Sequence, residues 1–489
     1  MAYLNFTFQK NNKAVLHSDA FDIIREQLSV ETELFLRRGG KFQRKKTRTY
    51  AITSAGVVDI GLVPELVKLA SQLGFPVSVS LDDKVKSILK PSFKFEENKQ
   101  ALAFDQFELR PYQKESVELA VPRGRGIIVL PTATGKTLTM ASLIKTILNE
   151  NPLDGKHILI LVPDIGLVNQ THADFLKYGL EYSCSKWSGS FEFDSTSKVI
   201  VCNQAILRSE SQQEIVQYLK KNTGLIIVDE VHTLKKDNAS TKIIDEFETI
   251  HRYGFTGTLP DAQLDYWTLL GKIGPVLSKV EAHEMRSDEW IADVIAKIIF
   301  IKHQNPPHIV VDIKEPNKAY LEETEWLIQN HFRNTLMCNF ANKLKKNSLL
   351  LVNRKEHGRQ MLEIAKSLDV NNEKEIYFIE GEVDVEEREK VQKMMEEKDN
   401  IICIAMSSIF STGISINNLH YVFFCSGGKS RIRIIQSIGR GSRLHHSKEK
   451  MILFDFADNT RYSFKHLQQR ISLYKQEKIS HEKIEIKEV

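Results

Sequence analysis

The stretch GIIVLPTATGKTLTMASLIKTILNE, residues 126–150, decides the fold of the region around it. An apolar run, GIIVL (126–130), precedes a short loop that ends in Gly-Lys-Thr, and a helical pattern follows at 137–150. This arrangement is typical of a phosphate-binding loop, in which backbone N–H groups and a helix N-terminus hold the phosphates. Leu130 stands where the full GxxxxGK[ST] pattern has its first glycine. The residues expected around the phosphates are Thr132, Ala133, Thr134, Gly135, Lys136 (on the β- and γ-phosphates) and Thr137 (on Mg²⁺).

Two acidic residues follow a later apolar run, GLIIVDEVH (224–232). In an open α/β sheet, ligands bind at the carboxyl ends of the strands, which is where Asp229 and Glu230 are expected. Asp229 fits the acidic residue that holds Mg²⁺ in phosphate-loop enzymes. Glu230 is placed to orient or activate an attacking water as a general base. Together the two segments predict a site that hydrolyses a nucleoside triphosphate.

Short apolar runs alternate with helical patterns from about residue 100 onward. Continuous Val/Ile/Leu strands separated by helices predict a parallel sheet that is covered on both faces. The first set of strands is expected at 126–130, 157–162, 198–202, 224–229 and 252–257, with helices at 137–150 and 241–250. A second set is expected at 348–352, 375–380, 400–406, 421–425 and 451–456. The sequence therefore predicts an α/β protein with two parallel-sheet domains in tandem.

The two ends of the chain depart from this pattern. Residues 1–95 are predicted to form a small α+β unit, with helices at 21–28 and 64–74 and strands at 49–53 and 75–81. The stretch 461–478 is predicted to be a helix that packs on the second domain. We expect a small accessory domain at 1–95, α/β domains at 96–279 and 280–460, and a helical tail at 461–489.

Composition excludes several classes of protein. At about 150 residues per domain, 489 residues correspond to roughly three domains. With 42% hydrophobic and 27% charged residues, the chain is neither disordered nor fibrous. No apolar run has membrane-spanning length, the first residues lack the zones of a secretory signal, and the five cysteines form no CxxC pair. We expect a soluble protein of a reducing compartment, without a membrane partner.

Basic residues are concentrated in RRGGKFQRKKTR (37–48), although the net charge of the chain is only +4. A run of like charge is commonly a solvated loop, and a nucleic-acid-binding patch is the alternative. The Gly-Gly pair at 39–40 predicts a hairpin or loop that presents these charges outward. The seven basic residues are Arg37, Arg38, Lys41, Arg44, Lys45, Lys46 and Arg48.

The second predicted domain contains QSIGRGSR (436–443). Arg440 and Arg443 are three residues apart, which would place them on one face of a helix. A surface pair is the ordinary explanation of such a spacing. Guanidinium groups can also stabilise the charge on a phosphoryl group during its transfer.

Eight short blocks occur along the chain in a specific order. They are LRPYQ (109–113), PTATGKT (131–137), LVPDIGLVNQ (161–170), DEVH (229–232), TGTLP (256–260), LLLVNRKEHG (349–358), SSIFSTGISI (407–416) and QSIGRGSR (436–443). In this order and spacing the chain strongly resembles the core of the superfamily 2 helicases, over about 350 of its 489 residues. The resemblance implies two RecA-like domains, ATP and Mg²⁺ as cofactors, and a nucleic-acid partner. Many members of this superfamily lack the first glycine of the phosphate loop.

The resemblance also implies roles for individual residues. Arg110 and Gln113 match the adenine-reading group, and Thr256 and Thr258 match the hydroxyls of the motif that couples hydrolysis to movement. Gln170 would contact nucleic-acid phosphates. Two further blocks complete the set. One supplies Thr412 and Gly413, which would touch the nucleic-acid backbone and the nucleotide, and the other supplies Gln436, Arg440 and Arg443, of which Arg443 resembles an arginine finger most.

The DEVH and TGT blocks are closer to those of DNA translocases than to the DEAD and SAT blocks of RNA-remodelling enzymes. Among DNA translocases (RecG-like enzymes, XPB-like enzymes and restriction motor subunits), the chain looks most like the UvsW-type phage recombination helicases. That resemblance implies fork regression, branch migration and unwinding of forks, junctions or RNA–DNA hybrids, in recombination, repair and replication. The resemblance also implies that the basic run binds DNA. It implies the host cytoplasm as the location of the protein, and recombination or single-strand-binding proteins as its partners.

Other functions stay open at this point. A restriction-type motor subunit shares the core but should carry or bind a nuclease or methyltransferase, and no convincing nuclease constellation is found. An RNA helicase is possible because the blocks do not distinguish the sugars. A clamp without turnover should have broken catalytic positions, and a small P-loop kinase would not explain the second domain.

Overall fold

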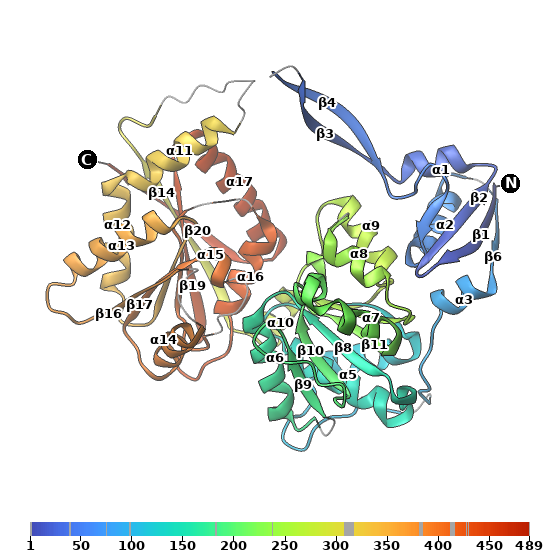
Figure 1. Ribbon diagram of the computed structural model, residues 1–489. Coiled ribbons are helices and arrows are strands. Elements are labelled where there is room, and N and C mark those ends of the chain that lie inside the picture. Colours follow the sequence, from blue (N-terminus) through green and yellow to red (C-terminus); the bar gives the residue numbers. More distant parts are fainter. Residues whose placement is uncertain are drawn as a thin grey trace. The chain divides into compact units, whose positions relative to one another are not determined.

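The computed structural model describes residues 2–38, 41–74, 76–96, 99–180, 183–236, 238–307, 317–380, 385–410, 416–426, 428 and 430–488. For residues 33–38, 41–45, 385–386, 409–410 and 431–433 it describes the backbone alone. The chain divides into two compact units, residues 1–131 with 135–280 and residues 281–489 with 132–134 (Figure 1). In this described part of the chain, every helix is too short or too polar to cross a membrane.

A seven-stranded, all-parallel sheet forms the centre of the first unit. The strands are completely buried in its middle, which agrees with the continuous apolar runs of the sequence. In spatial order they are β13 (Val276–Lys279), β7 (Arg125–Val129), β12 (His251–Thr256), β11 (Thr223–Val228), β8 (His157–Val162), β10 (Val199–Asn203) and β9 (Cys184–Trp187).

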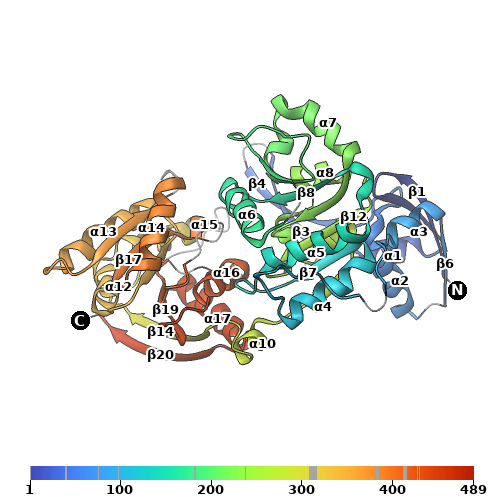
Figure 2. The same ribbon diagram turned by 90° about the horizontal axis from the view of Figure 1, so that it is seen from below.

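Helices cover both faces of this sheet (Figure 2). One face packs on α7 (Gln213–Asn222), α8 (Ala239–Asp245) and α9 (Gln263–Lys272), whose apolar residues share a core with those of the strands. The other helices of this domain, which pack side by side, are α4 (Pro111–Ala120), α5 (Lys136–Glu150) and α6 (Ile165–Tyr178).

The N-terminal residues form a small mixed sheet in the order β5-β2-β1-β6. Its core is continuous with the core under α9, so the small sheet belongs to the same compact unit as the first parallel sheet. A boundary at 95–96 therefore stays a prediction. The elements are β1 (Ala2–Lys10), β2 (Lys13–Ser18), α1 (Phe21–Gln27), β5 (Val57–Asp59), α2 (Val63–Gln72), β6 (Val77–Leu81) and α3 (Asp83–Leu89).

The basic run forms the end of β3 (Ser29–Arg38) and most of β4 (Lys41–Tyr50), which pair as an antiparallel hairpin. These two strands pair only with each other among the described strands (Figure 1). The hairpin predicted from the Gly-Gly pair is confirmed, although the pair itself lies outside the described residues. The strand predicted at 49–53 ends at Tyr50 as part of β4.

A second seven-stranded parallel sheet forms the centre of the second unit. On one face its core includes α12 (His331–Lys343) and α13 (Lys355–Leu368), and on the other α14 (Val385–Glu397), α16 (Arg431–Gly441) and α17 (Arg461–Gln476). Shorter or peripheral helices are α10 (Ala282–Ser287), α11 (Lys318–Gln329) and α15 (Ser407–Phe410). The strands, in spatial order, are β16 (Glu375–Ile379), β17 (Ile401–Met406), β15 (Ser348–Val352), β18 (Tyr421–Phe424), β19 (Lys450–Asp458), β14 (Asp293–Lys302) and β20 (Ser480–Lys487).

The predicted α/β class with two parallel-sheet domains is thus confirmed. The tail differs from the expectation of helix alone, because β20 follows α17 and adds an edge strand beside β14. Its polar sequence, SHEKIEIK, suits an edge strand, where one side faces solvent. Ion pairs join it to β14, with Lys302 Nζ 2.6 Å from Glu485 Oε2 and Lys297 Nζ 3.2 Å from Glu482 Oε1.

Candidate active site

The phosphate-loop sequence lies between β7 and α5, as its pattern predicts. Gly135 precedes the helix with φ +79°, a left-handed backbone that glycine adopts without a steric penalty. A Cβ at this position would lie 2.6 Å from Gln113 Nε2, so the close approach also requires glycine. Ala133 has φ +71° in the same loop, which is uncommon for a residue with a side chain and typical of functional sites. Lys136 is the first residue of α5.

Gln113 holds the loop from α4. Its side chain is buried, its Oε1 accepts a hydrogen bond from the Arg110 backbone N at 2.9 Å, and its Nε2 donates to the Gly135 carbonyl at 3.2 Å. The structure therefore brings this predicted residue directly to the phosphate loop. A role in reading adenine stays a prediction for both Gln113 and Arg110.

The two predicted acids lie beside the loop lysine. Lys136 Nζ donates to Glu230 Oε1 at 2.5 Å and lies 3.9 Å from Asp229 Oδ1. The residues come from different places: Lys136 opens α5, while the acids follow β11, in a sheet where β12 separates β11 from β7. Glu230 has φ +47°, so the backbone turns sharply where the strand ends. Parallel strands end at one edge of a sheet, and this brings the three side chains together.

A polar chain continues from Glu230 to the end of β12. His232 Nδ1 lies 3.3 Å from Glu230 Oε2 and 2.8 Å from Thr256 Oγ1. The Thr256 hydroxyl in turn donates to the Thr258 carbonyl at 2.9 Å. The sequence predicted roles for the two threonines but none for His232. The signal was the histidine of DEVH itself, one turn after the acids, and its partner depended on the pairing of β11 with β12.

The charges at the site are set by burial and by Lys136. Burial raises the pKa of Asp229, and the negative charge of Glu230 adds to that rise, while Lys136 opposes it. Burial alone would also raise the pKa of Glu230, but Lys136 and His232 more than compensate, so it lies below its ordinary value. Glu230, the closer partner of the ammonium, is therefore ionised at neutral pH.

The residues present fit a magnesium–nucleotide complex. A carboxylate at Asp229 and a hydroxyl at Thr137 are oxygen ligands of the kind that Mg²⁺ takes, and Lys136 is a compact charge suited to phosphate. The hydroxyl of Thr258 is buried and has no hydrogen-bond partner among the described residues. It can therefore donate a hydrogen bond to a ligand at this edge of the sheet.

Gln170, the residue expected to contact nucleic acid in this unit, lies on α6 and is half-buried. The helix begins after Asp164, whose Oδ1 accepts from the Leu167 backbone N at 3.0 Å. Contact of Gln170 with nucleic acid stays a prediction. Among the other residues expected to bind nucleic acid, Thr412 lies outside the described residues, as does its neighbour Gly413.

The second unit carries Gln436 and Arg440, both buried, on α16. Arg443 does not share a helical face with Arg440, because α16 ends at Gly441 and the Ser442 hydroxyl bonds back to the Ile438 carbonyl at 2.6 Å. The expectation of one helical face was therefore wrong.

Lys448, which the sequence did not single out, fixes this end of the helix. Its Nζ donates to the carbonyls of Gly441 at 2.9 Å, Leu419 at 3.0 Å and Asn417 at 2.7 Å. Burial lowers the pKa of Lys448 to about 8.

Comparison with known proteins agrees with this geometry. Residues 106–261 match the family described as type III restriction enzyme, res subunit, and residues 331–445 match the helicase conserved C-terminal domain. The chain is a superfamily 2 helicase. It hydrolyses ATP, and both of its parallel-sheet domains contribute to the matched core.

Two curated relatives extend over most of the helicase. The ATP-dependent DNA helicase uvsW of Enterobacteria phage T4 is 29% identical over 394 residues, which cover 76% of each chain. The DNA 3'-5' translocase XPB2 of Sulfurisphaera tokodaii is 25% identical and covers 69% of this chain and 79% of the relative. Among solved structures, Dbp5 of S. cerevisiae bound to RNA and ADP BeF3 has a TM-score of 0.54 at 16% identity, over 77% of this chain and 89% of that chain. This last likeness shows the fold alone.

Proposed function

We propose that this helicase is an ATP-driven DNA translocase that acts on branched DNA. It would regress forks, migrate branches and unwind forks, junctions or R-loops, in recombination, repair and replication. The name of the phage relative supports DNA as the substrate. The origin of that relative in a phage supports the host cytoplasm as the location. Recombination and single-strand-binding proteins would be its partners.

In this proposal ATP supplies the bond whose hydrolysis drives movement, and residues of both units handle its phosphates. Lys136 and Thr137 bind the phosphates and Mg²⁺ with Asp229, while Glu230 takes the proton of the attacking water. Arg440 and Arg443 stabilise charge on the phosphoryl group.

The observation that carries the DNA assignment is the distribution of charge along the β3–β4 hairpin. Near its base the basic residues have acidic partners, since Lys46 Nζ lies 2.7 Å from Glu31 Oε1 and Arg48 pairs with Glu26. Toward its tip the register contains no acid. The pairs there are Lys45 with Leu34, Arg44 with Phe35, Arg37 with Phe42 and Arg38 with Lys41.

The register places Arg38 directly opposite Lys41. Like charges opposite each other on neighbouring strands destabilise a hairpin, and a polyanion between them would remove that repulsion. The five basic residues near the tip would therefore contact phosphates, and Lys46 and Arg48 would contribute less because nearby acids already offset them.

The hairpin is attached to a rigid support. Lys236 Nζ, after β11, donates to the carbonyl of Tyr50 at the hairpin's base. Below it, Lys272 on α9 bridges Asp59 of the small sheet (Nζ to Oδ1 2.7 Å) and Asp245 of α8. Asn12 Nδ2 also donates to the Gly271 carbonyl at 2.8 Å, inside the shared core. DNA held by the hairpin would thus keep a fixed relation to the ATP-binding domain.

The test compares ATPase stimulation by single-stranded DNA, duplex DNA, forked DNA, four-way junctions and RNA in parallel. We expect forks and junctions to stimulate hydrolysis more than plain single strands, and DNA more than RNA. Equal or greater stimulation by RNA would favour the RNA helicase alternative. Equal stimulation by all forms of DNA would contradict the branched-DNA assignment.

Two hairpin variants refine this test. The tip variant replaces Arg37, Arg38, Lys41, Arg44 and Lys45 with Gln, and the base variant replaces Lys46 and Arg48 with Gln. Each lost phosphate contact flattens the slope of log affinity against log salt by about 0.7–0.9. We expect the tip variant to lose several such contacts on forks and the base variant to lose fewer than one. If the slope of log affinity for forked DNA against log salt is the same for the wild type and the tip variant, the hairpin does not bind DNA.

A further inference from the structure

A pocket of about 140 Å³ opens in the second unit, at the carboxyl edge of its sheet. Asn353 and Arg354, directly after β15, line it together with Ser426, which follows β18. The helices that follow these two neighbouring strands cover opposite faces of the sheet, since α13 packs in one core and α16 in the other. This is the topological switch point, where open α/β sheets bind ligands.

One wall of the pocket is aromatic. Tyr320 of α11 meets two rings of α17 edge-on, with its ring centroid 5.5 Å from that of Tyr462 and 5.7 Å from that of His466. Tyr320 is 37% exposed, and Tyr462 is half-buried, so both rings are partly accessible. Aromatic faces of this kind are the surfaces on which nucleic-acid bases stack.

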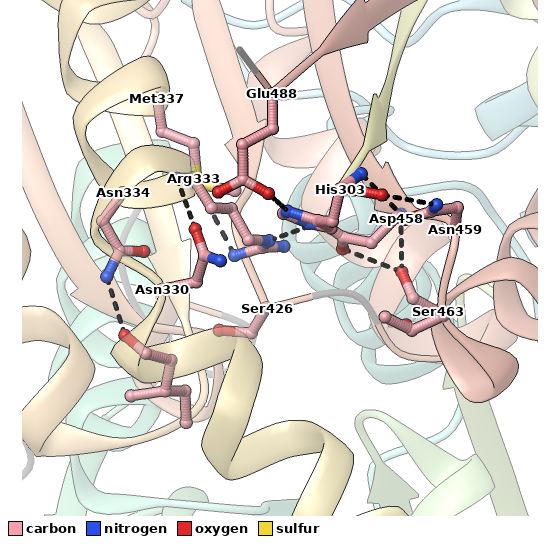
Figure 3. Close-up of polar contacts among 12 residues, drawn as sticks. His303, Asn330, Arg333, Asn334, Met337, Ser426, Asp458, Asn459, Ser463 and Glu488 are labelled. Atoms are coloured by element: carbon pink, nitrogen blue, oxygen red, sulfur yellow. Dashed lines mark hydrogen bonds and ion pairs between the residues drawn. The ribbon is translucent and has the colours of Figure 1, made fainter. Parts of the chain in front are cut away.

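The charged residues that line the pocket have protein partners, and for Arg354 this is Glu325, with Nη1 3.5 Å from Oε2. The Glu323 carboxylate caps α17, accepting from the Thr460 hydroxyl and from the Ser463 backbone N, both at 2.7 Å. Arg333 Nε donates to Asp458 Oδ1 at 3.0 Å, and Asp458 is also bound by His303 Nε2 at 3.0 Å (Figure 3). Little net charge therefore remains to hold an isolated phosphate in the pocket.

The floor of the pocket is polar but neutral. His357 Nε2 lies 3.0 Å from Asn334 Oδ1, and its Nδ1 lies 3.3 Å from the Ser426 hydroxyl. Burial lowers the pKa of His357 to about 3, so its ring is neutral at physiological pH. The Ser426 hydroxyl also accepts from the Asn353 backbone N at 3.0 Å. The bonds to Asn334 and Ser426 occupy both ring nitrogens of the buried His357. The neutral polar groups that line the pocket and can meet the edge of a planar polar ring are therefore the side-chain amide of Asn353 and the hydroxyl of Ser426.

We propose that this pocket takes a pyrimidine base that has left the stack of the bound DNA strand. A cavity of about 150 Å³ accommodates a benzene ring, so 140 Å³ has room for one six-membered ring. Tyr320 would stack on its face, Tyr462, whose ring lies at 76° to that of Tyr320, would contact its edge, and Asn353 and Ser426 would bind its polar groups. The inference rests on the proposed function, because the base comes from the strand that the helicase tracks.

The test measures the affinity of the full-length protein for oligothymidylate and for an abasic strand of equal length, which keeps the sugars and phosphates. Wild type should bind the thymidylate strand at least fivefold more tightly, which corresponds to about 1 kcal/mol. Tyr320→Ala/Tyr462→Ala should bind both strands equally, and Tyr320→Phe/Tyr462→Phe should keep the wild-type preference. Tyr3→Ala, which alters a 47% exposed tyrosine of the first unit, is the matched control.

A melting temperature measured for each variant shows whether it is folded, and the single Tyr320→Ala variant replaces the double variant if that one unfolds. A preference that survives loss of the tyrosines, or a wild type without preference, overturns the pocket assignment while leaving the DNA helicase assignment intact. Absence of binding to either strand and to forks would contradict both. Retention of radiolabelled thymidine by wild type, with equal binding of both strands, would mean that the pocket takes a free nucleoside instead.

Discussion

Replacement of Glu230 with Gln should separate nucleotide binding from hydrolysis. Glu230 Oε1 lies 2.5 Å from Lys136 Nζ, and Oε2 lies 3.3 Å from His232 Nδ1, so a glutamine of the same shape retains the packing. The amide cannot take a proton from water. Loss of a general base lowers turnover about 10²- to 10⁴-fold, or about 3–5 kcal/mol of transition-state stabilisation.

The same change should leave ATP affinity equal or make it higher. In the structure Lys136 is bound to Glu230, and it must leave this partner to reach a phosphate. Hydrogen bonds to charged groups contribute about 1.5–3 kcal/mol, so complete loss of the competitor would strengthen binding by roughly 10- to 150-fold, which is the upper limit of the gain. Asp229, 3.9 Å from the ammonium, keeps part of the competition and limits the gain.

Rapid-quench measurement of single-turnover hydrolysis, together with equilibrium titration of a non-hydrolysable ATP analogue, gives the two quantities independently. Glu246→Gln is a matched control, because Glu246 is half-exposed and pairs with Lys220 at 2.5 Å in the same unit. A collapse of analogue affinity would show that Glu230 is structural or a metal ligand. A loss of turnover smaller than tenfold would show that it is not the base.

Three further outcomes follow from the same structure. Lys136→Ala should abolish ATP hydrolysis and unwinding but leave DNA binding largely intact, as filter binding and an ATPase assay would show. Arg443→Ala should lower turnover by about 10³-fold with little loss of nucleotide affinity, and Arg440→Ala should act in the same direction less strongly, which stopped-flow kinetics can separate. His357 has a folded pKa of about 3 against an ordinary 6.5, so its contribution to stability is present above pH 6.5 and is lost as pH falls toward 3. Urea unfolding should lose about 2 kcal/mol from this group between pH 7 and pH 5, and His357→Gln should remove that part of the loss.

Much of the fold could be predicted because the central strands are apolar throughout. HILILV at 157–162 and SLLLV at 348–352 became β8 and β15 with the predicted bounds. Such runs are bounded by turn residues and need both faces covered, so their identity as parallel strands depends on no distant contact. The helix predicted at 241–250 was wrong beyond Asp245, where the Glu248 backbone N bonds instead to the Lys220 carbonyl before β12 begins.

Three of the four edge strands of the two seven-stranded sheets were missed for the opposite reason, although the fourth, β16, was predicted. β9, β13 and β20 are short or polar and lie at the margins of the two sheets. Their assignment depends on a neighbouring strand that offers free hydrogen-bonding groups, and this cannot be read from the local pattern. Gly441, the last residue of α16, also depends on a distant strand, since a Cβ there would lie 2.1 Å from Met451 Sδ of β19.

The residues of the candidate site also fall into those that the local sequence predicts and those that depend on contacts distant in sequence. Lys136, Asp229 and Glu230 could be predicted because each follows or precedes a strand whose end is evident in the sequence. Gln113 was found only through resemblance, and its bond to the Gly135 carbonyl supplies a physical reason for it. His232 was missed because its contact with Thr256 requires that β11 and β12 be neighbours, although they are separated by the whole of α8 in sequence.

The pocket of the second unit shows most directly what a sequence leaves open. Glu323, Arg333 and Asp458 look like surface charges in the sequence, yet each is buried and bound to a partner from another element. Once packing has satisfied them, and Glu325 has paired with Arg354 at 3.5 Å, the groups offered to a ligand are the neutral side chains of Asn353 and Ser426 and the rings of Tyr320 and Tyr462. The presence of these charged residues in the sequence would predict an ionic site for a phosphate. Their contacts in the structure instead predict a site for a planar, uncharged ring. Recognition at this edge therefore depends on which charges the fold has already satisfied.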